Sequence, residues 1–196
     1  MAKSKASKDL AALNNFTDMC HPDSLRSRIS LLNQQQRRIF DDVTERLSST
    51  DENEPPFYLF LTGNAGTGKS FLLSVLIDAV KHIKISPGDD LKKPPLIVMA
   101  PTANAASIIG GKTIDSVLGF NPTDVNRYSQ LDASRLSMMK FQFEEVKVAF
   151  LDEVSMVGST KLTKINFRFQ DLAEGCQKRE FMGGLSFIAT GSLLIS

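Results

Sequence analysis

The sequence has no excess of charge of either sign and few cysteines, and each absence removes a class of protein. The 23 basic and 22 acidic residues give a formal net charge of +1. A basic field over the whole chain therefore cannot be the argument for a nucleic-acid partner, and any such surface must be local. The two cysteines, Cys20 and Cys176, are far apart and outside any metal-ligand spacing. This count argues against a disulfide scaffold and favours a reducing compartment.

Long apolar segments are also missing. No run approaches the roughly 18 residues that a membrane span needs, so we expect no membrane partner. The first ten residues carry three lysines, Lys3, Lys5 and Lys8, with no apolar segment behind them. This composition is not that of a secretory signal. It is typical of a solvated tail more than of a nuclear address.

What is present is typical of one globular domain with a real core. The chain has 196 residues, of which 42% are hydrophobic and 23% charged. These values suit a single soluble globular domain of about 100–200 residues. We expect residues 1–28 to be a partly flexible N-terminal extension and residues 29–196 to be the folded domain. From Asn33 onward, apolar residues recur at helical spacing through Ile39, Phe40, Val43 and Leu47.

Short apolar runs of strand length then alternate with helical patterns. Strands are predicted at 57–62, 96–100, 146–151 and 186–190, and helices at 70–80, 103–109 and 160–172. Uninterrupted apolar strands between helices predict a parallel sheet covered on both faces. The segment 122–142 is mixed and polar, and the pattern assigns it no element.

A phosphate-binding loop follows the first predicted strand. The segment Gly63-Asn64-Ala65-Gly66-Thr67-Gly68-Lys69-Ser70 matches G-x-x-x-x-G-K-[S/T]. Glycines let the backbone point successive N–H groups at an anion, and the following helix directs its positive end to the same place. We expect Lys69 to reach the β- and γ-phosphates of ATP and the Ser70 hydroxyl to bind Mg²⁺.

An acidic pair ends the third predicted strand. In Val148-Ala-Phe-Leu-Asp-Glu153, Asp152 stands at the carboxyl end of the strand, where ligands bind in open parallel sheets. We expect Asp152 to hold the magnesium shell and Glu153 to orient or deprotonate the attacking water. The base-reading N-K-x-D segment of a GTPase is absent from the sequence. Small-molecule kinases rarely place a glutamate directly after the magnesium aspartate, so the pair favours an ATP-hydrolysing motor.

A third segment precedes the first strand, at Leu32-Asn33-Gln34-Gln35-Gln36. Asn33 and Gln36 have the spacing of a capping box at a helix start. Alternatively, the Gln36 amide reads the edge of an adenine base. The local sequence does not separate these two interpretations.

With these three segments in this order, the chain resembles the first RecA-like domain of the Pif-type (petite integration frequency) DNA helicases. These belong to helicase superfamily one, near RecD, and rolling-circle transposons carry the same block. The similarity covers roughly Leu31 to Gly191. Besides the segments above, it rests on Ala100-Pro-Thr-Ala-Asn-Ala-Ala106, Gly110 to Ser116, Leu151-Asp-Glu-Val-Ser-Met156, Ile165-Asn-Phe-Arg-Phe-Gln170 and Phe181-Met-Gly-Gly184.

The resemblance implies a fold, an activity and partners. The fold is a three-layer RecA-like domain of the P-loop NTPase class with a mostly parallel central sheet. The activity is ATP hydrolysis, with Mg²⁺ as cofactor, coupled to translocation on single-stranded DNA and to unwinding, in DNA repair, recombination and telomere maintenance. The implied compartment is the nucleus, with the mitochondrion as a second one. Thr102 and Thr113 are implied to lie along the single-strand track, although locally both could equally be helix caps or turn residues.

Two departures from the family pattern are visible. Asp115 stands where the family usually has histidine beside DNA, and a carboxylate disfavours contact with phosphate. The family continues its fourth strand into G-D-x-x-Q-L-P-P, whereas here the strand runs into Gly191-Ser-Leu-Leu-Ile-Ser196. We therefore expect a motor lobe truncated at its C-terminal end, without the second RecA-like lobe and its arginine finger.

Three hypotheses follow. The first is the ATPase lobe of a Pif-type helicase. The second is a catalytically impaired nucleotide-binding remnant of such a helicase or of a rolling-circle transposon. The third is an unrelated ATP-dependent switch with a protein partner.

Overall fold

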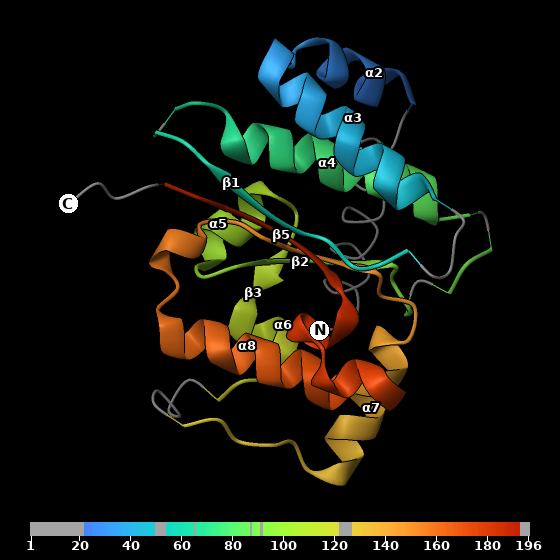
Figure 1. Cartoon of the computed structure of the whole chain (residues 1–196), viewed down its shortest axis with the longest axis vertical. Helices are drawn as coiled ribbons and strands as arrows, with labels where there is room; N and C mark the ends of the chain where they lie inside the picture. The colour runs from blue at the N-terminus through green and yellow to red at the C-terminus, as the bar shows by residue number, and fades with distance from the viewer. Residues whose placement is uncertain are drawn as a thin grey trace, which may run out of the picture.

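The computed structural model describes residues 22–49, 54–64, 66–86, 88–90, 92–121 and 127–192. Helices and parallel strands alternate along these residues (Figure 1). The strands are β1 (Tyr58–Thr62), β2 (Leu96–Ala100), β3 (Lys112–Thr113), β4 (Val148–Leu151) and β5 (Ser186–Gly191). The α-helices are α2 (Pro22–Ser30), α3 (Gln34–Ser48), α4 (Lys69–Lys84), α5 (Ala103–Ile108), α6 (Ile114–Leu118), α7 (Ala133–Phe143) and α8 (Ser159–Leu172). Three short 3₁₀ helices are η1 (Val154–Met156), η2 (Gly175–Arg179) and η3 (Phe181–Gly184).

The strands form one five-stranded sheet in the order β1-β5-β4-β2-β3. Every pairing in it is parallel, with Leu59 opposite Ile188, Ala149 opposite Phe187 and Ile97 opposite Ala149. The expected α/β fold with a mostly parallel sheet is confirmed, and the described strands are all parallel. All five strands therefore present their carboxyl ends at one edge of the sheet, which is where ligand sites of open α/β sheets lie.

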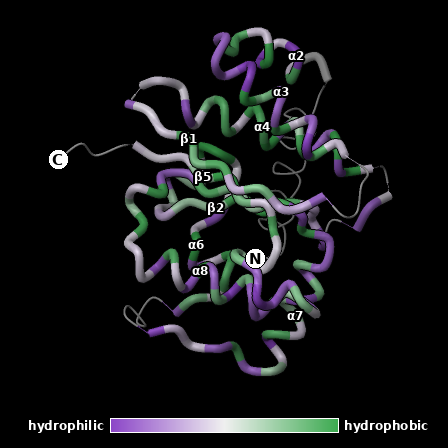
Figure 2. Tube along the Cα trace, in the orientation of Figure 1, coloured by the Kyte–Doolittle hydropathy of each residue, from purple (hydrophilic) through white to green (hydrophobic). Residues whose placement is uncertain are grey.

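Two hydrophobic cores make the molecule three-layered. One core lies between the sheet and the layer of α2, α3, α4 and α5, and the other lies between the sheet and α6 and α8 (Figure 1). Successive strand residues alternate between the two cores, because side chains of a strand point to opposite faces. Thus Leu96 and Ala100 face the first core, and Ile97 and Met99 face the second. Figure 2 shows the resulting concentration of apolar residues in the strands and in α4.

The N-terminal boundary expected at residue 28 falls inside α2. Leu25 belongs to the first core. Arg28 donates to the carboxylate of Asp78, which is only 1% exposed on α4, and Nη2 of Arg28 donates to Ser74 Oγ at 2.5 Å. Residues 22–30 therefore pack with the domain. The rest of the expected extension, residues 1–21, lies outside the described residues, and the domain boundaries stay a prediction.

Most predicted elements are present within two residues of their expected ends, and α4 extends four residues further than predicted. Besides α2 and the three 3₁₀ helices, the pattern missed β3, α6 and α7. The last of these falls in the segment 122–142 that the pattern left unassigned; residues 122–126 lie outside the described part of the chain. Of the helices described, none is long and apolar enough to cross a bilayer.

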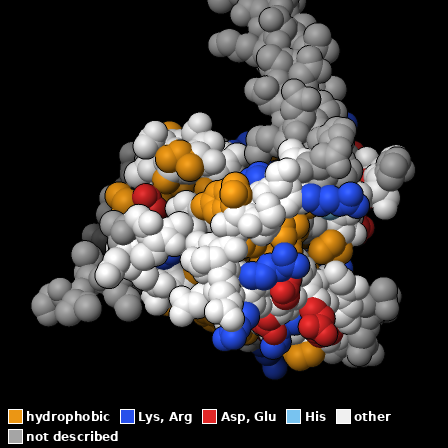
Figure 3. Space-filling view, turned by 90° about the horizontal axis from the view of Figure 1, so that it is seen from above, with side chains coloured by type: hydrophobic (Ala, Val, Ile, Leu, Met, Phe, Trp, Pro, Cys, Tyr) orange, Lys and Arg blue, Asp and Glu red, His pale blue; other side chains and the backbone are white. Residues whose placement is uncertain are grey.

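The visible surface is mixed in charge. On the face seen from above in Figure 3, basic and acidic side chains lie next to one another without a large area of one sign. Helix α3 contributes two exposed pairs at i,i+4 spacing, Arg37 with Asp41 and Arg46 with Asp42. This agrees with the near-zero net charge of the whole sequence.

Candidate functional site

The glycine-rich loop lies where the sequence predicts it, between β1 and α4. Gly66 and Gly68 both have φ of 79°, a region that costs side-chain-bearing residues roughly 1–2 kcal/mol. At Gly63 the backbone has an ordinary φ, but a Cβ there would lie 2.9 Å from Thr67 Oγ1. The loop is therefore too tight and too sharply turned for other residues at these positions. Ala65, also expected to bind nucleotide, lies outside the described residues.

Lys69 opens helix α4 and folds its side chain back over the loop. Its Nζ donates to the carbonyl oxygens of Gly63 and Asn64, at 2.7 and 2.8 Å. The Thr67 hydroxyl donates to the same Asn64 oxygen at 2.9 Å. These bonds hold the ammonium against the backbone of the loop, and Lys69 remains partly exposed.

Gln36 forms the capping box, one of the two arrangements that the sequence left open. Asn33 and Gln36 form a complete capping box at the start of α3, with bonds of 2.9 and 3.0 Å. The same Gln36 amide donates through Nε2 to the carbonyl oxygens of Thr67 and Gly68, at 3.2 and 3.4 Å. Gln36 therefore links the start of α3 to the phosphate-binding loop. Adenine reading stays a prediction.

The acidic pair lies at the carboxyl end of β4. Asp152 is 3% exposed, and its Oδ1 accepts a hydrogen bond from the Thr190 hydroxyl and one from the Glu153 amide, the latter at 2.9 Å. Oδ2 takes part in no hydrogen bond found among the described residues. Two donors on one oxygen fix the orientation of the carboxylate.

Glu153 occupies an uncommon backbone region. Its φ and ψ are 52° and 41°, left-handed values that few residues other than glycine adopt. Such a conformation costs of order 1–3 kcal/mol and clusters at functional sites. It turns the chain sharply out of β4, so that Glu153 is partly exposed one residue after the buried Asp152.

Strand β5 lies between the loop and the acidic pair. Thr62 at the end of β1 is opposite Gly191, and Leu151 at the end of β4 is opposite Ala189. Since neighbouring strands are about 4.8 Å apart, β1 and β4 run about 10 Å apart, and their carboxyl ends lie at the same edge of the sheet. A Cβ at Gly191 would lie 3.0 Å from Val154 Cγ1 and 3.2 Å from the Ser155 amide nitrogen, so a glycine there lets the segment after the acidic pair pack over β5.

The residues present suit a metal that keeps most of its ligands outside the protein. Ser70 and Asp152 offer oxygen atoms, the ligands that Mg²⁺ prefers. Among the described residues, no group of three or more His, Cys, Asp or Glu side chains could hold a metal. An all-protein metal cage therefore does not exist in this part of the chain, and the donor set fits Mg²⁺ bound together with phosphate oxygens and water.

Thr102 and Thr113 both cap helices, as the local interpretation predicts. Thr102 accepts from the Ala105 amide at 3.2 Å and Thr113 from the Ser116 amide at 3.3 Å. A hydroxyl that accepts a hydrogen bond still has its own proton to donate. Capping therefore does not exclude DNA contact, which stays a prediction for both residues.

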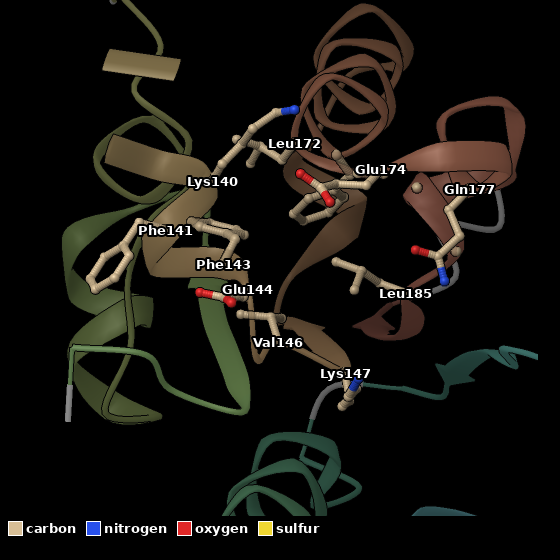
Figure 4. A pocket seen from close by; sticks show the side chains of 14 residues that line it. Lys140, Phe141, Phe143, Glu144, Val146, Lys147, Leu172, Glu174, Gln177 and Leu185 are labelled. Carbon is tan, nitrogen blue, oxygen red and sulfur yellow. The ribbon is translucent and has the colours of Figure 1, made fainter. Parts of the chain in front are cut away.

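A pocket of about 510 Å³ lies at the other edge of the sheet, before β4 and β5 (Figure 4). Its apolar lining includes Phe169, Leu172 and Leu185, and Lys140 and Glu174 stand among the charged residues around it. None of the predicted site residues lines it. We locate the candidate site at the carboxyl edge instead, because the chemistry-bearing side chains converge there.

Sequence reasoning missed two features of the site. Thr190 was assigned only to a buried strand, yet its hydroxyl, 1% exposed, binds Asp152. A hydroxyl ending the strand beside an acidic strand end was the available signal. Asp115, expected to disfavour DNA contact, forms an ion pair with Lys161 of α8, and no short-range pattern connects these two residues.

Comparison with known families gives one extended match. The chain matches the model of the PIF1-like helicase family over residues 31–194. Among curated proteins, it is 33% identical over 134 residues to the ATP-dependent DNA helicase PIF1 of Candida albicans. It is 32% identical over 136 residues to that of Saccharomyces cerevisiae. Each match covers 68% of this chain and only 14% of the relative, so the chain spans about a seventh of those proteins.

Solved structures agree. The crystal structure of Pif1 helicase from Candida albicans is 27% identical, with a TM-score of 0.60, over 82% of this chain and 32% of that one. Bacteroides Pif1 bound to single-stranded DNA, at 24% identity and a TM-score of 0.55, shows the same fold. A match over most of the chain, together with the RecA-like fold, establishes that the chain belongs to the PIF1-like helicase family.

Proposed function

We propose that this chain binds ATP with Mg²⁺ and forms the first motor lobe of a Pif-type ATP-dependent DNA helicase. The observation that carries the proposal is the convergence of the loop and Lys69 with Asp152 and Glu153 at one edge of the sheet. The named relatives are ATP-dependent DNA helicases, but the chain spans a small part of them. Translocation and unwinding are therefore proposed for the whole protein and ATP binding for this lobe.

The triphosphate binds on the concave side of the loop. Backbone N–H groups of residues 63–70 and the amino-terminal end of the 16-residue helix α4 supply the positive potential. Lys69 exchanges the carbonyl oxygens of Gly63 and Asn64 for the β- and γ-phosphates, because charge-assisted bonds to phosphate are stronger than those to neutral carbonyls. In this proposal Gln36, which the capping box holds beside the loop, reads the adenine.

Ser70 and Asp152 hold Mg²⁺ in this proposal, through the serine hydroxyl and the second carboxylate oxygen. Bound there, the ion would supply positive charge to the phosphates. Thr190 and the Glu153 amide fix the other oxygen of Asp152 and so set its orientation. In this proposal Glu153, which is partly exposed after the turn out of β4, orients the attacking water and accepts its proton.

Single-stranded DNA lies across the carboxyl edge beside β2 and β3, where the hydroxyls of Thr102 and Thr113 donate to phosphates. Half a motor neutralises few phosphates, so binding is weak and tolerant of sequence. Roles in repair, recombination and telomere maintenance, and a nuclear or mitochondrial location, are the finer expectations of the resemblance.

The test is a thermal unfolding experiment with and without Mg-ATP. A ligand at about 100 times its Kd adds roughly 2.7 kcal/mol to the free energy of unfolding, so the wild-type midpoint rises. Lys69→Ala should remove most of that rise. Lys147→Ala, which changes an exposed lysine before β4 at the opposite edge, should keep it. An equal rise in wild type and Lys69→Ala contradicts the proposal.

The second candidate function is nucleotide binding without turnover, as in a remnant of a helicase or of a rolling-circle transposon. The departures at Asp115 and after Gly191 favour it. Phosphate release measured with and without single-stranded DNA separates the two, because only the helicase lobe hydrolyses ATP.

A further inference from the structure

Asp115, the residue that departs from the family pattern, is paired with a lysine. Its Oδ1 accepts from the Nζ of Lys161. The two side chains are 36% and 32% exposed, so solvent and ligands reach both. Partly exposed ion pairs are weak, and another anion can displace either partner.

The pair lies beside the residues proposed to contact DNA. Asp115 is in α6, two positions after Thr113, and β3 pairs with the carboxyl end of β2, which Thr102 closely follows. Lys161 is in the first turn of α8, the helix that follows the carboxyl end of β4. Both residues are therefore at the edge of the sheet that carries the candidate site.

An aromatic ring positions Lys161 on its other side. The Lys161 ammonium lies 5.2 Å from the centre of the Phe120 ring, a distance suited to a cation–π contact. The guanidinium of Arg168 lies 5.3 Å from the same ring and 5.1 Å from that of Tyr128. Arg168 is 1% exposed, so it fixes Phe120 from inside and leaves Lys161 as the accessible cation of this cluster.

We propose, resting on the proposed function, that Lys161 is a phosphate-binding residue of the single-strand track and that Asp115 competes with DNA for it. In the free lobe the carboxylate neutralises the ammonium. A DNA phosphate must displace this carboxylate from the ammonium before it can bind. Asp115 therefore lowers the affinity for single strands, and it does so through Lys161.

Binding of a fluorescent, unstructured oligonucleotide, followed by anisotropy at several salt concentrations, tests this. Asp115→Asn frees the lysine and should bind several-fold more tightly at low salt. One added phosphate contact steepens the salt dependence by about 0.7. The gain should therefore shrink about 2.6-fold between about 50 mM and about 200 mM salt. Lys161→Ala should bind more weakly than wild type, and Asp115→Asn in the Lys161→Ala background should gain nothing.

Glu144→Gln is the matched control. Glu144 pairs with Lys93 at 2.5 Å, also at the surface, but at the amino ends of β2 and β4, on the opposite edge of the sheet. Removing this carboxylate changes the net charge by the same amount and should leave DNA binding unchanged. A gain equal to that of Asp115→Asn would reveal a general charge effect and overturn the inference.

Three further outcomes also overturn it. A gain that persists in the Lys161→Ala background would show that Asp115 repels DNA without involving the lysine. Wild-type binding with no gain in Asp115→Asn would overturn this inference and leave the proposed function standing. Absence of single-strand binding in wild type and variants alike would overturn both, while the Mg-ATP stabilisation would still report nucleotide binding separately.

Discussion

At the scale of single residues, Asp152 and Glu153 are neighbours in sequence with opposite environments. Asp152 is buried and held by two donors, whereas Glu153 is partly exposed on a left-handed turn. A fixed carboxylate suits a metal ligand, and an accessible one suits a base that exchanges protons with water. Their different surroundings argue for the two different roles proposed.

Glu153→Gln should keep ATP binding and slow turnover by about 10²–10⁴-fold, the usual contribution of a general base. Thermal stabilisation by Mg-ATP and phosphate release together measure the two effects. Asp152→Asn should instead weaken the magnesium-dependent part of binding. Glu145→Gln, at an exposed position before β4, is the control for charge. Loss of ATP binding in Glu153→Gln would rule out its role as the base.

The two left-handed glycines of the loop provide a matched pair of substitutions. A Cβ at Gly66 meets nothing within 4 Å, whereas one at Gly68 would lie 2.7 Å from Gln36 Nε2. Both changes to alanine carry the same backbone cost of about 1–2 kcal/mol, because both positions have the same φ. Only Gly68→Ala should push the Gln36 amide off the loop.

Adenine-nucleotide affinity, measured by calorimetry, should therefore fall more in Gly68→Ala than in Gly66→Ala. The extra loss should disappear in a Gln36→Ala background, because the displaced contact is already absent there. If the two glycine variants lose equal affinity, the link between Gln36 and the loop has no role in binding.

At the scale of elements, the sequence predicted the strands and helices whose own residues show a clear apolar pattern. It missed the short elements and the contacts that depend on tertiary packing. The predicted strands are short, mostly apolar runs, and a predicted helix follows each of the first three. The phosphate loop follows from local glycine chemistry. By contrast, β3 has two residues and α6 has five, too few for a period to show. Helix α7 buries only Met139 fully among its residues, so its apolar stripe is weak. The Asp152–Thr190 and Asp115–Lys161 contacts join distant elements and leave no local pattern.

Two of the segments shared with the family, 165–170 and 181–184, pack against each other and have a structural role. Asn166 Oδ1 on α8 accepts a hydrogen bond from the Met182 backbone amide of η3 at 2.7 Å, and Gln170 Nε2 donates to the backbone carbonyl oxygen of Glu180 at 3.0 Å. Gly183, with φ of 62°, lies so close to α8 that a Cβ would be 2.5 Å from the Phe169 carbonyl oxygen. The glycine thus permits η3 to pack on α8 and to lead into β5.

Gly183→Ala should lower the free energy of unfolding by about 2–4 kcal/mol. It combines left-handed strain with overlap against a backbone atom that cannot move aside. Gly175→Ala is the control, since Gly175 has φ of 57° and open space around it, and should cost about 1–2 kcal/mol. Urea unfolding of the two variants measures the difference. Equal losses of unfolding free energy in the two variants would mean that the close contact between η3 and α8 at Gly183 does not contribute to stability.

At the scale of the whole molecule, the described residues form one lobe built on one sheet. Translocation needs two track-binding lobes that open and close around ATP, and an arginine from the opposite lobe contributes about 10³–10⁵ to the rate in related phosphate-loop enzymes. A polypeptide of these 196 residues, assayed alone, should therefore hydrolyse ATP slowly and not separate strands. A tailed-duplex displacement assay, with Lys69→Ala as control, decides this. ATP-dependent displacement by the wild type alone would mean that self-association supplies the second lobe.

The strand order also determines the stage of folding at which the strand before the phosphate-binding loop is paired, and therefore when the loop can take its final conformation. Among the described strands β1 pairs only with β5, and the Phe57 amide reaches Ser186 Oγ across 129 positions of sequence. During synthesis on a ribosome, β1 therefore emerges early and remains unpaired until almost the whole domain, including β5, has been synthesised. Contacts between residues this distant in sequence form slowly. Until they form, the unpaired strand can pair with other chains and aggregate. Tyr58 and Phe60 of β1, still half-exposed in the finished fold, would be the groups that a chaperone meets on the nascent chain.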